Sequence, residues 1–338
     1  MSRSALKLTL TVALAAAPAF AHHSFVAFDA DSEAIVRGTV TGFEFRNPHT
    51  YLFVDVPQPD GGVLPWRIEA ETMNDLYRNG WREDSAQPGD LVTVRVYPAV
   101  DTARRYGRLK SMEKIDGTYL EIPNEDDERG RDNLVPASGI DGVWLPIQTF
   151  ASYFGVIEPL VNEQARSERQ RYGASDALPP NTRCVDMSIP QRLGRAHVYE
   201  IETVSENLIL IHGEDDAEPR RIYLDGRPHP KTIPEDQQSY TGHSIGRWEG
   251  GTLVIDTTHF KYQDNGHAGY PSGGRKHLVE RFTLSDDKTH IVIDVSMEDP
   301  EFLTAPVVHQ FQWQHSPHIV RLPHSCDRES ALGYLEVN

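Results

Sequence analysis

The chain of 338 residues carries 33 basic and 50 acidic residues, which gives a formal net charge of −17. This acidic balance argues against nucleic acid and against an anionic membrane surface as partners, because both bind through clusters of Lys and Arg. The length exceeds what a single hydrophobic core usually serves and therefore predicts more than one domain.

Residues 1–21 have the pattern of an export signal that is removed. A basic start precedes an apolar run at Leu8–Ala17, which is too short to cross a bilayer. Ala19 and Ala21 are small residues at the two positions that signal peptidase reads, so cleavage after Ala21 would leave His22 first. Cleavage after Ala19 is the alternative. We expect a soluble periplasmic or secreted protein with no segment inserted in a membrane.

Residues 22–122 are expected to form one β-rich domain. A short helix is expected at 72–81, where Thr72 can cap the first turn and Asn79-Gly80 can end the last. Alternating apolar and polar residues predict strands at 33–47, 50–57, 63–71, 89–98 and 104–116. Three strands, a helix and two strands follow the order of the five-stranded oligonucleotide/oligosaccharide-binding (OB) barrel.

Residues 123–136 are charged and bounded by prolines, which indicates a solvated acidic linker to a second domain at 137–338. That domain is expected to begin with a strand at 139–147 and a helix at 158–173. Eight further strands are expected at 196–204, 207–213, 220–226, 243–250, 251–260, 276–284, 289–297 and 307–314. Sequential strands with short connections predict an antiparallel β-barrel or a strongly curved sheet, either of which can enclose one small ligand.

The chain contains two cysteines, Cys184 and Cys326. In an oxidising compartment we expect them to form a disulfide that ties the start of the second half to its end. Two unrelated buried thiols are the alternative.

Several motifs are similar to those of an uncharacterised family of exported bacterial proteins, a domain of unknown function. "HHSFVAFD" at residues 22–29 and "RGTVTGFEFRNPHTYLFVDV" at 37–56 carry this resemblance, which extends from residue 22 to about 120. The second half, with "RIYLDGRPHP", "GHSIGRWEGGTLVIDT" and "MEDP", resembles the larger proteins in which this domain is fused to another β-rich domain of unknown function. The resemblance implies export and a modular organisation, and it adds no substrate.

The segment "GHSIG" at residues 242–246 satisfies the G-x-S-x-G pattern of a nucleophilic serine. That pattern requires an apolar strand before the serine and a helix after it. The preceding "PEDQQSYT" is polar, and the following "RWEGGTLVID" is typical of a hairpin. We therefore interpret the segment as the start of a strand.

Polar side chains on apolar strand faces are candidate catalytic groups. Glu280, Asp256 and His309 alternate with apolar residues and are expected to point into the second barrel, where burial would shift their pKa values. The alternative is a salt-bridged core, with Arg281 or Arg247 neutralising the carboxylates.

A small ligand in the second domain would have its own contact residues. Those expected are Arg227, His229, His243, Arg247 and Trp248. "DGRPHP" at 225–230 is typical of a turn, from which Arg227 and His229 can reach the barrel mouth.

The chain has 15 histidines and no spacing typical of a structural zinc site. After cleavage, His22 would offer an α-amine beside its own imidazole. His49, at the start of a strand, could supply a third nitrogen for copper(II), with His23 as a substitute. Surface histidines without a metal are the alternative.

Three functions therefore remain open. The protein binds a small molecule in its second domain, or it binds copper at His22, His23 and His49, or it is an acid–base enzyme of the lyase, isomerase or hydrolase type.

Overall fold

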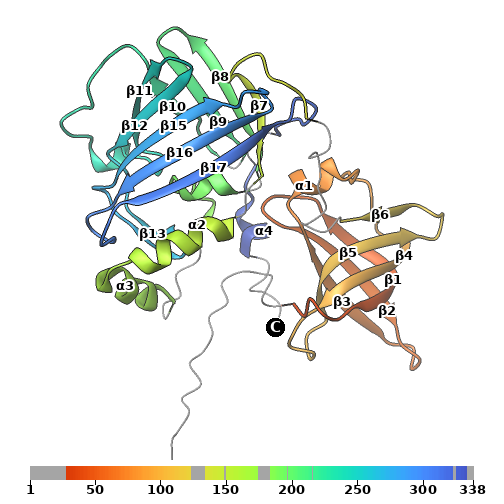
Figure 1. The fold of residues 1–338 in the computed structure, drawn as a ribbon. Helices are drawn as coiled ribbons and strands as arrows, with labels where there is room; N and C mark the ends of the chain where they lie inside the picture. The colour runs from red at the N-terminus through yellow and green to blue at the C-terminus, as the bar shows by residue number, and fades with distance from the viewer. Residues whose placement is uncertain are drawn as a thin grey trace, which may run out of the picture.

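A computed structural model describes residues 28–122, 134–147, 150–173, 183–195, 197–214, 216–322 and 325–332 (Figure 1). The expected signal segment, His22, His23 and most of the expected linker lie outside these residues. Two β-rich units are present, and both predicted barrels are confirmed. None of the helices in the described ranges is long and apolar enough to cross a membrane.

The first unit is a closed five-stranded barrel of OB topology. Its strands are β1 (Ala34–Glu44), β2 (Thr50–Pro57), β3 (Val63–Ala70), β4 (Leu91–Pro98) and β5 (Tyr106–Lys114). β1 pairs with β2 and β4, and a parallel pairing of β3 with β5 closes the barrel. A short strand, β6 (Tyr119–Glu121), extends the sheet beyond β5.

The helix of the first barrel, α1 (Met73–Arg78), begins where the sequence predicts. The backbone N–H of Asp75 donates to Thr72 Oγ1 at 3.0 Å, which caps the first turn. Leu76 turns inward and is fully buried. Gly80 follows with a φ of +86°, a conformation that stops the helix at little cost only for glycine.

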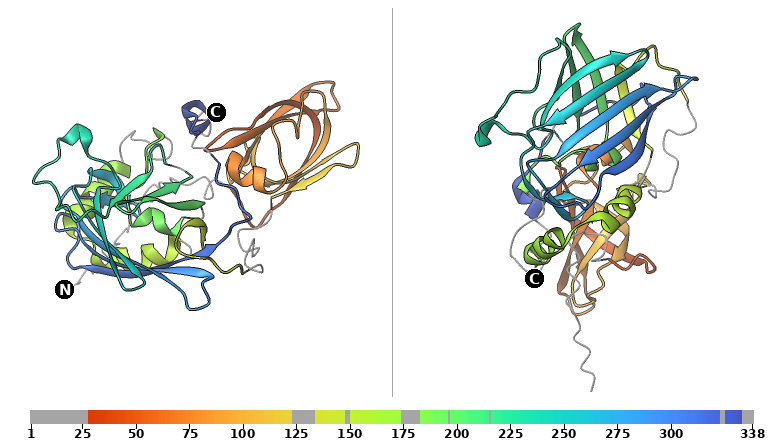
Figure 2. Two further views of the ribbon diagram at one scale, coloured as in Figure 1. Left: turned by 90° about the horizontal axis from the view of Figure 1, so that it is seen from above. Right: turned by 60° about the vertical axis from the view of Figure 1, so that its left-hand side comes forward.

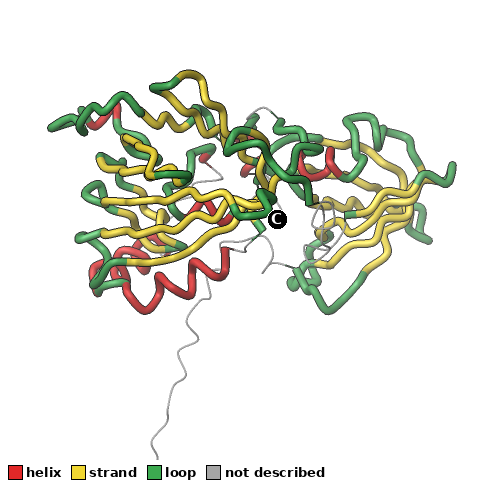
Figure 3. Tube along the Cα trace, turned by 45° about the horizontal axis from the view of Figure 1, so that its top comes forward, coloured by secondary structure: helices red, strands yellow, loops and turns green. Residues whose placement is uncertain are grey.

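The second unit is a closed nine-stranded barrel (Figure 3). Its strands in chain order are β7 (Gly142–Pro146), β8 (Tyr199–Ser205), β9 (Leu208–Gly213), β10 (Arg220–Tyr223), β11 (His243–Glu249), β12 (Thr252–Thr258), β15 (His277–Leu284), β16 (His290–Glu298) and β17 (Val307–His315). Neighbouring strands are antiparallel except β10 and β11, which run parallel. The connection between these two is the long loop 224–242, which contains the 3-10 turn Glu235–Gln237.

Short elements cover one end of the second barrel (Figure 2). The helix α2 (Phe150–Ile157) packs against β17, and α3 (Glu163–Gly173) packs against a hairpin of β13 (Gln263–His267) and β14 (Tyr270–Ser272). Two 3-10 turns, Glu158–Leu160 and Gln191–Gly194, complete this layer. The sequence predicted the helix at 158–173, which is a turn followed by α3, and it missed α2 and the hairpin.

The expected disulfide between Cys184 and Cys326 is present, with Cα atoms 5.6 Å apart. It holds the segment 325–332, which ends in α4 (Arg328–Leu332), beside the first barrel. Asp327 N donates to Asn47 O at 2.8 Å, and the Ser330 hydroxyl donates to the backbone oxygen of His49. The segment 325–332 thus contacts the first barrel and is covalently tied to the second unit through Cys326.

Candidate functional site

Glu280 points into the second barrel, as its strand pattern predicts, and an arginine neutralises it there. Both Glu280 and Arg220 are buried. Nη1 of Arg220 donates to Glu280 Oε1 at 2.9 Å, and Nη2 pairs with the other carboxylate oxygen. Arg220 also donates to Ser244 Oγ at 3.1 Å and to Thr257 Oγ1 at 2.9 Å. The salt-bridged core is therefore the arrangement observed, with Arg220 as the partner.

Ser244, the serine of the G-x-S-x-G segment, lies inside this buried network and is 1% exposed. Gly242 precedes β11 with a φ of +68°, and a Cβ there would lie 2.7 Å from the backbone oxygen of Thr258. Glycine is thus required by close packing at a strand start, which agrees with the sequence interpretation. The hydroxyl of Ser244 is not presented to solvent.

His309 shares the inner face with Glu280, because the register runs from Glu280 through Val295 to His309. Two strand spacings, about 10 Å, separate them. The His309 ring instead lies 5.8 Å from the ring of Tyr153 in α2, and burial lowers its pKa. The structure therefore does not bring Glu280 and His309 into contact.

Asp256 faces away from both of these groups. Its neighbour Ile255 is the register partner of Glu280, so Asp256 lies on the opposite, outer face of the barrel. The prediction that Asp256 points inward is wrong. Val254 shares the outer face with Asp256 and is only 1% exposed. Both faces of β12 therefore carry buried apolar residues, and the sequence alternation does not show which face is the inner one.

On the outer face, Asp256 is the centre of a group of histidines. Its Oδ1 lies 3.0 Å from His229 Nε2 and 3.0 Å from His277 Nε2. His229 Nδ1 in turn lies 2.9 Å from His243 Nδ1. Three of these residues stand on β11, β12 and β15, and the loop 224–242 carries His229. We call His229, His243, Asp256 and His277 the histidine cluster.

The hydrogen bonds of the histidine cluster fix where its protons lie. An ionised carboxylate accepts only, so His229 Nε2 and His277 Nε2 both carry hydrogen. When His229 is neutral, its Nδ1 is an acceptor, and His243 must donate to it from Nδ1. The neutral cluster therefore has two nitrogens with lone pairs available to a ligand, Nδ1 of His277 and Nε2 of His243.

Aromatic stacking supports His243 from its other side. The Tyr223 ring lies 5.5 Å from the His243 ring, and the guanidinium of Arg227 lies 4.0 Å above Tyr223. Burial lowers the pKa of His243, and the neighbouring His229 and His259 lower it further. The neutral imidazole is therefore the form favoured near pH 7.

A pocket of about 270 Å³ adjoins the histidine cluster at the barrel rim. We call it the rim pocket, and it is lined by Gln238, Thr258, His259, Gly274, Arg275, Lys276 and His277. His259 has a φ of +57°, in the left-handed region, which histidine adopts more often than most residues other than glycine. The loop 224–242 contributes Gln238, and connections of this length are usually functional.

None of the five residues expected to contact a ligand lines the rim pocket, and two of them lie well away from it. Arg247 and Trp248 stand near the far end of β11, about 15 Å along the strand from His243. Arg247 and Arg281 both pair with Glu249 on the outer face, so neither neutralises the interior. Among the five expected contact residues, His229 and His243 belong to the histidine cluster, and Arg227 supports it.

Lys276, which the sequence did not single out, is a buried cation beside the rim pocket. Its ammonium donates to Ser188 Oγ and Ile189 O, both at 2.6 Å, and to Ser272 Oγ at 2.8 Å. Burial lowers its pKa to about 7. A lysine has three N–H donors, and all three are used here. Its side chain therefore braces the pocket wall.

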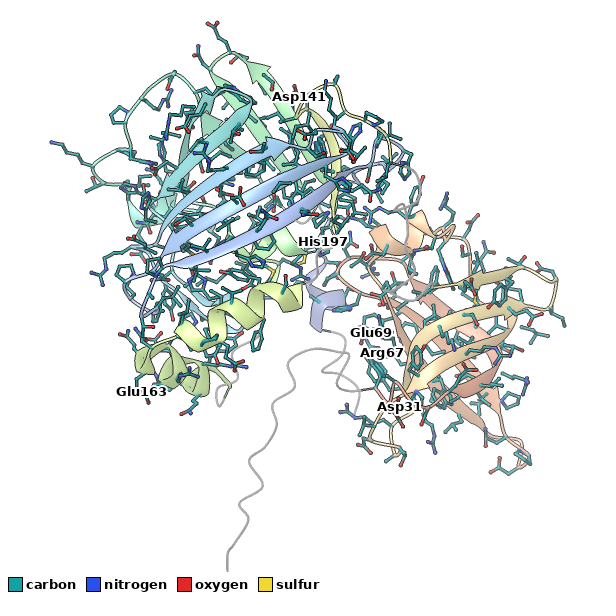
Figure 4. The ribbon with its side chains drawn as sticks, viewed as in Figure 1. Asp31, Arg67, Glu69, Asp141, Glu163 and His197 are labelled. Carbon is teal, nitrogen blue, oxygen red and sulfur yellow. A yellow bond between two sulfur atoms is a disulfide. The ribbon has the colours of Figure 1, made fainter. Side chains whose placement is uncertain are left out.

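In the first barrel, His49 is held by the buried carboxylate of Glu69, a residue labelled in Figure 4. The Nδ1 atom of His49 lies 3.1 Å from Glu69 Oε1. Glu69 is 3% exposed and also accepts a hydrogen bond from the Tyr106 hydroxyl. This geometry orients His49 Nε2 away from the carboxylate. Within the described part of the chain, no three His, Cys, Asp or Glu side chains are grouped so as to hold a metal ion.

Comparison with known proteins finds a match for one part of the chain. Residues 10–107 match the model of a family of unknown function, DUF6152, and this stretch includes most of the first barrel. The match covers less than a third of the chain. No curated protein and no solved structure matches.

Proposed function

We propose that the second barrel binds a small anionic molecule in the rim pocket. The observation that carries this proposal is the pocket lining. Every charged or titratable side chain there is a base: His259, Arg275, Lys276 and His277. Gln238 and Thr258 add an amide and a hydroxyl donor. The three N–H groups of Lys276 stay bound within the protein, so the donors open to a ligand come from the other side chains. A set of donors without a carboxylate fits a ligand with oxygen acceptors, such as a carboxylate.

The size of the pocket limits the ligand. Pockets for drug-sized molecules usually exceed about 300 Å³, and this one has about 270 Å³. The barrel interior is occupied by large buried side chains such as Phe282, Phe311 and Trp313. The ligand is therefore a small metabolite held at the rim of the barrel.

The test compares benzoate with its neutral analogue benzamide by ligand-observed NMR on the full-length chain. We expect saturable binding of benzoate, weak or no binding of benzamide, and loss of benzoate binding in His259→Gln. His212→Gln is the matched control, because His212 pairs with Glu202 on the same barrel, outside the pocket lining. Equal binding of both molecules, or an equal loss in the control variant, would contradict the proposal.

A second candidate function is copper(II) binding at His49 in the exported protein. One observation favours it: a metal-binding imidazole usually donates its other N–H to a carboxylate, and Glu69 is placed to accept from His49 Nδ1. Phe28, the first described residue, packs on Tyr106 with ring centroids 5.1 Å apart. Phe28 lies six positions after His22 in the sequence, a distance along the chain of about 20 Å at most.

The copper proposal is tested with protein that begins at His22. We expect His49→Ala to abolish tight copper(II) binding and Glu69→Gln to weaken it about 10- to 100-fold. One extra N-terminal residue should also weaken it, because it removes the amine of His22. Unchanged affinity in His49→Ala would contradict the proposal, and His212→Ala controls for scattered surface histidines.

A further inference from the structure

We propose that the rim pocket hydrolyses small esters that carry a carboxylate, with His277 as general base and Asp256 as its positioning residue. This inference rests on the proposed binding of a small anion in that pocket. Of the catalytic set expected from the sequence it keeps only Asp256, since Glu280 is paired inside the barrel and His309 lies beneath α2.

His277 meets the two requirements of a general base. It lines the rim pocket, and its side chain is 44% exposed, so water can reach it. Its Nε2 lies 3.0 Å from Asp256 Oδ1, which holds the hydrogen on Nε2 and leaves the lone pair on Nδ1. A base with a fixed tautomer accepts a proton at one defined atom.

Asp256 is itself fixed from a second side. The same Oδ1 accepts from His229 Nε2 at 3.0 Å, and His229 is braced by His243. The carboxylate therefore has little freedom to rotate away from His277. Its negative charge also lies where a positive charge would develop on the His277 ring, which stabilises the protonated base.

The hydrolytic step follows from these positions. The oxygen of a water molecule attacks the ester carbonyl carbon while one of its protons moves to Nδ1 of His277. The tetrahedral intermediate then breaks its bond to the leaving alcohol, which takes the proton back from Nδ1. Gln238 and Arg275 line the same pocket and carry N–H donors suited to the oxyanion.

The experiment measures hydrolysis of 4-acetoxybenzoate to acetate and 4-hydroxybenzoate by the full-length protein. We expect His277→Gln to lower the catalysed rate about 10²- to 10⁴-fold, the usual contribution of a general base. Asp256→Asn should lower it strongly and alter its pH profile, because an amide can donate to Nε2 and favour the wrong tautomer. His212→Gln should keep the wild-type rate.

Benzoate binding separates failure of this inference from failure of the proposed function. An Asp256→Asn variant that binds benzoate and shows native circular dichroism, but has lost hydrolysis, supports the inference, because Asp256 does not line the pocket. Wild-type protein that binds benzoate and hydrolyses the ester no faster than His277→Gln overturns the inference and leaves binding intact. An equal loss of rate in His212→Gln also overturns it, since any exposed imidazole would then suffice.

Discussion

Replacing Glu280 with Gln is expected to destabilise the second barrel severely while leaving the rim pocket unchanged. Glu280 is fully buried, and its partner Arg220 is 4% exposed. The substitution removes the negative charge and turns an acceptor into an amide donor that faces a guanidinium donor. Removing one member of a buried ion pair leaves an uncompensated charge, which costs about 3–5 kcal/mol of unfolding free energy.

The assay is urea unfolding followed by tryptophan fluorescence, together with the melting temperature. A loss of 3–5 kcal/mol corresponds to a decrease of about 6–20 °C for a domain of this size. The double variant Arg220→Met/Glu280→Leu should recover most of the loss, because it buries no charge. A loss below about 1 kcal/mol in Glu280→Gln, or no recovery in the double variant, would refute the reasoning. Benzoate binding should persist, since Glu280 and the histidine cluster lie on opposite faces of the sheet.

Three further changes have definite outcomes. Folding depresses the pKa of Lys276 from its ordinary 10.5 to about 7. Between these values the unfolded chain binds more protons, so the free energy of unfolding should rise with pH by up to about 1.4 kcal/mol per unit. Unfolding of Lys276→Met at pH 7 and pH 9 should lack this contribution, and the same change of free energy with pH as in the wild type would contradict it. Replacing Cys184 and Cys326 with Ser opens a loop with a sequence separation of 142. The free energy of unfolding should fall by about 5 kcal/mol, and equal stability against denaturant with and without the disulfide would disprove this. His229→Ala should release the loop 224–242, seen as faster amide exchange there, and exchange like that of the wild type would show that His229 does not hold it.

Most strands could be predicted because alternation of apolar and polar residues reports one-sided burial. α2 could not, since "FASYFGVI" is a short, mostly apolar run, interrupted only by Ser152 and Gly155, that does not distinguish a buried strand from a short helix. The parallel pairing of β10 with β11 was also hidden. Two short strands that follow each other in sequence suggest an antiparallel hairpin. Only the length of the loop 224–242 indicates that the chain returns to the start of β10 before β11 begins.

The candidate site was half visible in the sequence. His229 was expected at the barrel mouth and His243 among the ligand contacts, and both are found in the histidine cluster. The face of Asp256 was misjudged because Val254, on the same outer face, is buried between its register partners Arg247 and Arg281, so an outer face carries an apolar buried residue. His277 opens a strand without any motif, and its role depends on Asp256, 21 residues earlier, which no local pattern reveals.

The disulfide-tied segment 325–332 has a consequence for biosynthesis. The first barrel is made early, yet the partners of Asn47 and of the His49 backbone are synthesised 278 and 281 residues later. The barrel can close during translation, but the environment of His49 is complete only after the second barrel has folded and Cys326 has been oxidised. Pulse-labelled protein should therefore acquire its final protease resistance around His49 at the rate of disulfide formation, well after the strands of the first barrel have paired.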